Sequence, residues 1–129
     1  MGLRNETKFI TYKRFDKAVD KIPYPNAMII IADIMSFQRA YQQSDTGGEL
    51  PKRFHFTPLE NVAGRYSLYE IYVGSNDNHR AVVMFPHSRI CGQSLAFWVY
   101  TFKKQRGIDH PQVERAKAVA HECWDSLER

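Results

Sequence analysis

The chain has 129 residues, of which 43% are hydrophobic and 13% aromatic, and it carries a net charge of +4. This composition predicts one folded domain spanning residues 1–129 rather than a disordered tail, and the positive charge favours an anionic partner such as nucleic acid. No apolar run approaches the roughly 20 residues that cross a bilayer, and the first residues do not resemble a signal peptide, so we expect a cytoplasmic protein without a membrane partner.

The N-terminal third predicts one strand and one helix. Residues 9–12 are a short β-prone run. From Ala27 to Tyr41, apolar residues recur at spacings of three and four, which predicts a helix with one apolar face. Asn26 is the predicted N-cap, and the glycines at 47–48 are the expected stop.

The middle of the chain predicts a series of strands. Phe54 and Phe56 alternate with His55, which predicts a short strand that Pro58 closes. Three longer β-prone runs follow, separated by segments of turn residues, at 66–73, 79–85 and 95–102. The last run is almost entirely apolar or aromatic, as a strand buried on both faces would be.

The C-terminal segment predicts a second amphipathic helix. Apolar residues repeat at three and four from Val113 to Leu127, and Asp109 or His110 can cap the start. The predicted fold class is therefore α+β: a small, antiparallel-rich β-sheet with helices packed against it, in a single domain.

Most familiar enzyme motifs are absent from the sequence. Cys91 and Cys123 fit no metal or redox spacing, and the five histidines do not form a zinc pattern. The chain also lacks a nucleophilic serine elbow, a phosphate-binding glycine loop and a dinucleotide fingerprint. We therefore expect neither a metal nor a cofactor.

Basic residues gather where two predicted strands meet. If the 79–85 and 95–102 strands are antiparallel neighbours, the start of one lies beside the end of the other, which puts Arg80 near Lys103. With Lys104 and Arg106, these residues could clamp a phosphate through charge-assisted hydrogen bonds, as RNA binding or RNA cleavage requires. A solvated basic surface is the alternative interpretation.

Cleavage would also need proton transfer and contacts to the bases. His79, His87 and Glu70 are possible acids or bases, and Tyr100 and Lys104 are also open candidates for the general base. Tyr72 and Tyr100 are candidates for stacking on bases. Glu70 could equally be an ordinary cross-strand ion-pair partner, and the tyrosines could be core residues.

Four segments, in this order and spacing, resemble the RelE/HigB-like toxins of bacterial type II toxin–antitoxin systems, in particular the phage-related HigB-type branch. They are the strands at 68–73, 80–85 and 98–104, and Pro111 with the helix that follows it. The resemblance spans residues 54–120, and each segment alone is short.

The resemblance implies a small sheet with helices on one side and an mRNA endonuclease that often acts on the translating ribosome. It also implies a cognate antitoxin protein that neutralises the toxin. By matching positions, Arg80 takes the phosphate-contacting arginine and Glu70 the strand glutamate, while Lys103, Lys104 and Arg106 take the basic cluster after the last strand.

The chain departs from this pattern at Tyr72, where the family has an arginine. Arg65 is a candidate to supply the missing charge as an RNA-binding residue, and Tyr72 a candidate to stack on a base instead. Two alternatives on the same fold stay open: a ParE-like inhibitor of DNA gyrase, and a non-catalytic RNA-binding or phage accessory protein.

Overall fold

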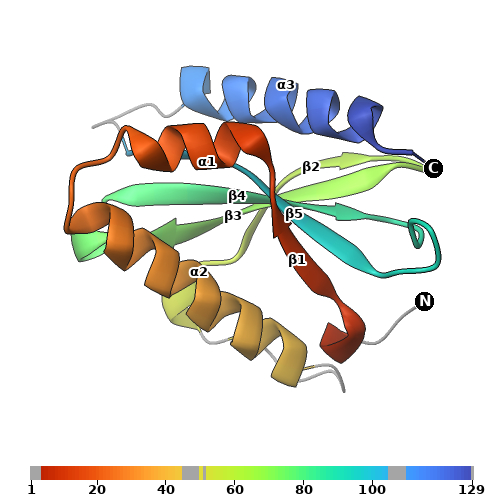
Figure 1. Cartoon of the computed structure of the whole chain (residues 1–129), viewed down its shortest axis with the longest axis horizontal. Coiled ribbons are helices and arrows are strands. Elements are labelled where there is room, and N and C mark those ends of the chain that lie inside the picture. Colours follow the sequence, from red (N-terminus) through yellow and green to blue (C-terminus); the bar gives the residue numbers. More distant parts are fainter. Residues whose placement is uncertain (1–3, 45–49, 51, 105–109, 129) are drawn as a thin grey trace.

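The computed structural model describes residues 4–44, 50, 52–104 and 110–128 (Figure 1). In this described part, five strands form one sheet in the order β1-β5-β4-β3-β2. The strands are β1 (Lys8–Thr11), β2 (Thr57–Val62), β3 (Tyr66–Val73), β4 (His79–Pro86) and β5 (Leu95–Lys103). The α-helices are α1 (Lys13–Asp20), α2 (Asn26–Gln43) and α3 (His110–Ser126).

The sheet is mostly antiparallel, which confirms the predicted α+β class. Strands β2, β3, β4 and β5 pair antiparallel in succession, while β1 runs parallel to β5. The β3 strand has the predicted bounds, and β4 and β5 each extend one residue further. β4 and β5 are neighbours, as expected.

Helices cover both faces of the sheet, so the single-sided arrangement implied by the family resemblance is wrong. On one face, Ile30 and Phe37 of α2 pack with Phe15 of α1 against Val83 and Trp98 of the sheet. α3 packs on the other face, and α1 lies along β5 between α2 and α3 (Figure 1).

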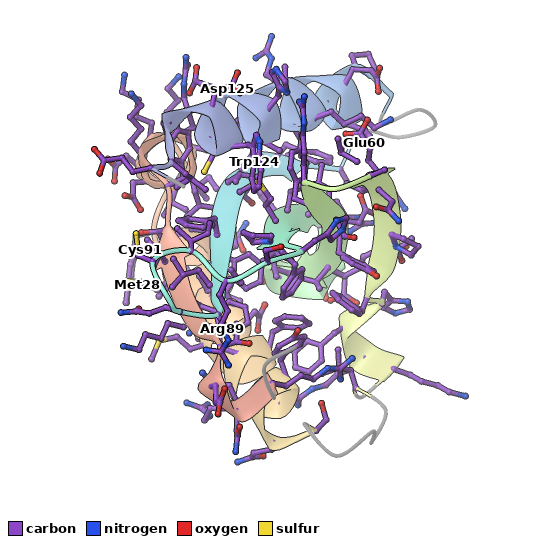
Figure 2. The ribbon with its side chains drawn as sticks, turned by 90° about the vertical axis from the view of Figure 1, so that its right-hand side faces the viewer. Met28, Glu60, Arg89, Cys91, Trp124 and Asp125 are labelled. Atoms are coloured by element: carbon purple, nitrogen blue, oxygen red, sulfur yellow. The ribbon has the colours of Figure 1, made fainter. Side chains whose placement is uncertain are left out.

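The α3 face has its own core. Ala116, Ala120, Cys123 and Trp124 of α3 belong to one buried cluster with sheet residues that include Tyr66. Figure 2 shows Trp124 on the sheet side of α3 and Asp125 on its outer side. Because both faces of β5 meet a helix, its central residues are fully apolar and buried, as its sequence predicted.

The predicted strand at Phe54 and Phe56 is wrong. Phe54 ends a short 3-10 turn, His55 has a φ of 50°, and β2 begins only at Thr57. Pro58 lies inside β2 rather than closing a strand before it. β2 is an edge strand with an irregular register at this point, and an edge position tolerates a residue that cannot donate a hydrogen bond.

Two features of the N-terminal third also differ from the prediction. Helix α1 was not predicted, since Phe15 is its one buried residue and the pattern around it is mainly charged. Pro25, not Asn26, occupies the N-cap of α2, and Asn26 is the first helical residue. The predicted glycine stop at 47–48 and the cap at Asp109 lie outside the described residues.

The β1 strand covers only part of β5. It pairs with Leu95 to Trp98, and the backbone N–H of Tyr12 then donates to the carbonyl of Trp98 over 2.8 Å. Among the described residues, no strand pairs with the outer edge of β5 beyond this point. Instead, α1 and α3 flank this second half of β5.

Candidate functional site

Arg80, the predicted phosphate ligand, is buried and engaged by the protein itself. Its residue exposure is 2%, and its Nη1 donates to the carbonyls of Asp77 at 2.8 Å and His79 at 3.1 Å. The guanidinium carbon lies 3.4 Å from the centre of the Tyr72 ring, and Nε is 3.9 Å from Glu70 Oε2. Arg80 therefore holds together the turn between β3 and β4.

Tyr72 and Glu70 are half-buried and form one cluster with the buried Arg80. The Tyr72 ring contacts Arg80 and also stacks on His55, with 4.2 Å between ring centres. Glu70 faces Arg80 across the pair of strands, which matches its interpretation as a cross-strand ion-pair partner.

Arg80 and Lys103 lie on opposite faces of the sheet. In the β4–β5 pairing, Arg80 is opposite Phe102, and His79 is opposite Lys103. Because neighbouring residues of a strand point to opposite faces, Lys103 shares its face with His79 and not with Arg80. Lys104 follows β5 and is exposed, whereas Arg106 lies outside the described residues.

Arg65 and His87 lie at the other end of β3 and β4. Tyr66 pairs with Pro86 there, the N–H of His87 donates to the carbonyl of Arg65 over 2.9 Å, and the His87 ring is 2.8 Å from Ser67 Oγ. At this distance along the strands, Arg65 cannot supply the charge that Tyr72 leaves missing beside Arg80.

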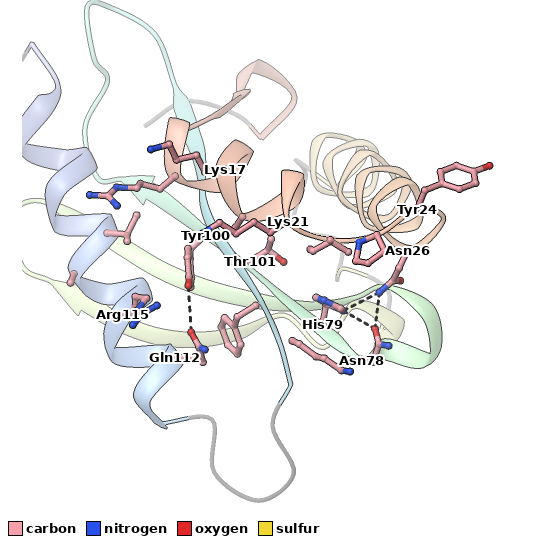
Figure 3. A pocket seen from close by; sticks show the side chains of 18 of the residues that line it. Lys17, Lys21, Tyr24, Asn26, Asn78, His79, Tyr100, Thr101, Gln112 and Arg115 are labelled. Carbon is pink, nitrogen blue, oxygen red and sulfur yellow. Dashed lines mark hydrogen bonds between the residues drawn. The ribbon is translucent and has the colours of Figure 1, made fainter.

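A pocket of about 880 Å³ opens beside the uncovered edge of β5, between α1 and α3 (Figure 3). Three of the predicted site residues line it: His79, Tyr100 and Lys103. Its cationic side chains are Arg14 and Lys17 from α1, Lys21 at the C-cap of α1, Lys103 from β5 and Arg115 from α3. We call it the basic pocket.

Glu122 is the acidic residue that lines the basic pocket among the described residues, and its charge is already paired. It accepts hydrogen bonds from Arg14 Nη2 at 2.9 Å and from the Tyr12 hydroxyl at 2.6 Å. These two bonds lower the pKa of Glu122 to about 2. The pocket therefore presents an excess of positive charge, and the Arg14–Glu122 pair joins α1 to α3.

His79 is held by two asparagines at one end of the pocket (Figure 3). Its Nδ1 is 2.8 Å from Asn78 Oδ1 and 3.2 Å from Asn26 Nδ2. Asn26 Oδ1 accepts from the N–H of Ser75 at 2.9 Å, which fixes the orientation of that amide. Both asparagines contact Nδ1, so neither of these contacts uses Nε2 of the ring.

Burial lowers the pKa of His79 below its usual 6.5, and the charge of Lys103 lowers it further. The ring is therefore neutral at physiological pH and can accept a proton. A neutral imidazole beside an ammonium group is a suitable pair for moving a proton next to a phosphate.

The cations on the walls of the pocket were not among the predicted site residues. Arg14, Lys17 and Lys21 are spaced by three and four residues, so they share one face of a helix. This spacing could have indicated a basic helix face, but only if the segment had first been predicted to be a helix. Asn26 was singled out as a helix cap, and its side chain instead bonds the turn that carries His79.

The described residues contain no cluster of three His, Cys, Asp or Glu side chains that could hold a metal ion. None of the helices in this part of the chain is both long and apolar enough to pass through a bilayer. Cys91 is exposed and Cys123 buried, and both are free thiols.

A scan against protein-family models found no match, and a search of curated protein sequences found none. Among solved structures, the chain is similar to one chain of the archaeal RelE–RelB complex from Pyrococcus horikoshii OT3. The TM-score is 0.52, and the alignment covers 79% of this chain and 99% of that chain at 14% identity. The fold is RelE-like. The likeness concerns the fold alone, so the finer HigB-type assignment stays a prediction.

The RelE-like fold separates the predicted site residues into three groups. One lines the basic pocket, one forms the cluster around the buried Arg80, and one lies at the far end of the strands. In that order, they are His79, Tyr100 and Lys103; Glu70, Tyr72 and Arg80; and Arg65 and His87.

Proposed function

We propose that this chain is the toxin of a type II toxin–antitoxin system and acts as a metal-independent mRNA endonuclease on translated mRNA. The observation that carries the proposal is the neutral His79 beside Lys103, in a pocket rimmed by four more cationic side chains. The RelE-like fold supports it as an analogy.

The proposed chemistry needs one base, one charge stabiliser and one acid. His79 Nε2 takes the proton of an RNA 2′-hydroxyl, and the 2′ oxygen attacks the adjacent phosphorus. The Lys103 ammonium stabilises the negative charge that develops on the phosphate. The bond to the 5′ oxygen breaks and that oxygen takes a proton from the Tyr100 hydroxyl. His79 then releases its proton to water, and Tyr100 regains one from water, which restores both side chains.

The products of this route are a 2′,3′-cyclic phosphate and a 5′-hydroxyl end. The buried Arg80 touches no RNA in this scheme and acts as a positioning residue, because its hydrogen bonds hold the turn that precedes His79. This assignment revises the role that sequence matching gave to Arg80.

A cognate antitoxin and the ribosome are the partners that the proposal implies. The similar structure is of a RelE–RelB complex, and a partner that neutralises the basic pocket would need acidic groups to cover it. A reading frame for such a protein is expected beside the gene for this chain.

Expression under tight induction, with mapping of the 5′ ends of cellular RNA within minutes, tests the proposal. We expect growth arrest and new ends clustered inside translated codons. New ends scattered over untranslated RNA would support the endonuclease activity but reject its dependence on the ribosome. Arrest with intact RNA would reject the nuclease and favour the gyrase-inhibitor alternative.

A non-catalytic RNA-binding protein is the second candidate, and the burial of Arg80 favours it. In this chain the position of the phosphate-contacting arginine is 2% exposed, and Tyr72 stands where the family has a second arginine. Salt-sensitive RNA binding with neither growth arrest nor cleavage would identify this function.

A further inference from the structure

The two walls of the basic pocket carry cations that the proposed chemistry does not use. Lys17 lies on α1 and Lys21 is the C-cap residue that follows this helix, while Arg115 lies on α3 across the pocket (Figure 3). All three are exposed. Among the described residues, none of the three has a carboxylate within 4.0 Å.

This arrangement differs from that of Arg14, whose charge is paired within the pocket. Arg14 forms an ion pair with Glu122, and this pair joins α1 to α3. Lys17, Lys21 and Arg115 instead leave like charges facing one another across a concave site, which raises the local positive potential. A ligand with several negative charges in a row would relieve this repulsion.

Aromatic and amide groups lie beside these cations. Tyr100 is half-buried in the pocket lining, and its hydroxyl is 3.4 Å from Gln112 Oε1. Tyr24 is 81% exposed at the rim. A basic groove with exposed aromatic rings is the arrangement by which proteins bind single-stranded nucleic acid, since phosphates follow the cations and bases stack on the rings.

We propose that a single strand of RNA runs through the basic pocket, with its phosphates on Lys17, Lys21 and Arg115 and bases against Tyr24 and Tyr100. This inference rests on the proposed function and names the route and form of its substrate. The route leads the backbone past His79 and Lys103, which line the same pocket.

The size of the pocket favours a single strand over a duplex. Its volume of about 880 Å³ lies between two helices and against one strand edge, which suits a ligand of a few nucleotides. A duplex also hides the base faces and edges that Tyr24, Tyr100 and Gln112 could contact.

Binding of a short 2′-O-methyl RNA oligonucleotide tests this route without cleavage, because the oligonucleotide lacks the attacking hydroxyl. Its affinity would be measured over a range of salt concentrations for the whole chain and for two double variants. Lys17→Ala/Lys21→Ala removes two charges inside the pocket. Lys8→Ala/Arg39→Ala removes two exposed charges outside it and is the matched control.

Each phosphate contact contributes about 0.7 to the slope of log affinity against log salt for a single strand. We expect the pocket variant to lose about 1.4 of that slope, from two contacts, and the control to keep it. We also expect tighter binding of the single strand than of the matching duplex. Equal slopes in the two variants, or equal binding of strand and duplex, would overturn the proposal.

An acidic protein segment is the other class of ligand for such a pocket. Saturable binding of a polyglutamate peptide by the pocket, with no binding of the oligonucleotide of equal charge, would assign the pocket to a protein partner and overturn the RNA route. If the oligonucleotide binds by this route but unmodified RNA is not cleaved, the proposed endonuclease activity is rejected and the proposed RNA-binding route is retained. Normal cleavage by the pocket variant at unchanged KM would reject the route and leave the nuclease.

Discussion

His79 and Arg80 are adjacent at the start of β4, and the pleat of the strand sends them to opposite faces of the sheet. His79 lines the basic pocket, bound by Asn78 and Asn26. Arg80 lies in the buried cluster with Tyr72. The two residues have separate roles: His79 is placed to transfer a proton, and Arg80 to hold the turn before it.

The pKa of His79 responds to Lys103 on the paired strand. We expect Lys103→Met to raise this pKa towards its usual 6.5, because the substitution removes the neighbouring positive charge that lowers it. An NMR titration of the His79 ring measures the shift.

Lys104→Met is the matched control, since it removes an adjacent exposed lysine that does not perturb His79. An unchanged His79 pKa in Lys103→Met would mean that the two side chains do not interact in solution.

We expect substitution of Arg80 to affect the stability of the fold directly and cleavage only indirectly. Arg80→Met removes two hydrogen bonds from a buried guanidinium and leaves Glu70 without this ion pair. We expect the free energy of unfolding to fall by about 3 kcal/mol. Urea unfolding measures it, with the exposed Arg65→Met changing stability by less than about 0.5 kcal/mol as a control. Equal effects of the two substitutions would contradict the buried role of Arg80.

At the scale of elements, strands were easier to predict than the segments between them. β3, β4 and β5 are long, rich in β-branched and aromatic residues and bounded by turn residues, so the sequence determined their bounds closely. α1 was missed because it is short and mainly charged, and its one fully buried side chain, Phe15, packs on Trp98 far along the chain. Phe15, Val19 and Ile22 repeat at spacings of four and three, but this periodicity covers only about two helical turns.

The turn from β3 to β4 shows how an element positions the site. Gly74 has a φ of +86°, and a Cβ there would lie 2.9 Å from Asn78 Oδ1 and 3.2 Å from Asn26 Oδ1. These are the side chains that hold His79. The glycine therefore serves both the backbone conformation and the space that the asparagines need.

Gly74→Ala should disturb His79 as well as the turn. We expect a loss of about 1 to 2 kcal/mol from backbone strain and crowding, together with a changed NMR signal from the His79 ring. Gly64→Ala is the control, because Gly64 has a φ of +75° but nothing within 4 Å of an added Cβ. The backbone strain introduced by Gly64→Ala should leave the NMR signal of His79 unchanged. An identical His79 signal in both variants would show that the asparagines do not depend on Gly74.

At the scale of the whole molecule, the arrangement of helices determines where a site can form. α2 and α3 cover opposite faces of the sheet, and α1 and α3 leave a pocket beside the half of β5 that β1 does not cover. The fold class and the neighbouring positions of β4 and β5 were predictable from strand order. The face of each side chain, and the basic wall from α1, required the three-dimensional structure.

The basic pocket, rather than the Arg80 cluster or the far end of the strands, is the proposed catalytic centre. The most direct test is to map RNA 5′-hydroxyl ends in cells that express the wild-type chain, His79→Gln, Lys103→Met or His87→Gln, each at equal protein level. We predict new ends with the wild type and with His87→Gln, and few or none with the two pocket variants. Persistent ends in both pocket variants, or their loss in His87→Gln alone, would contradict the account.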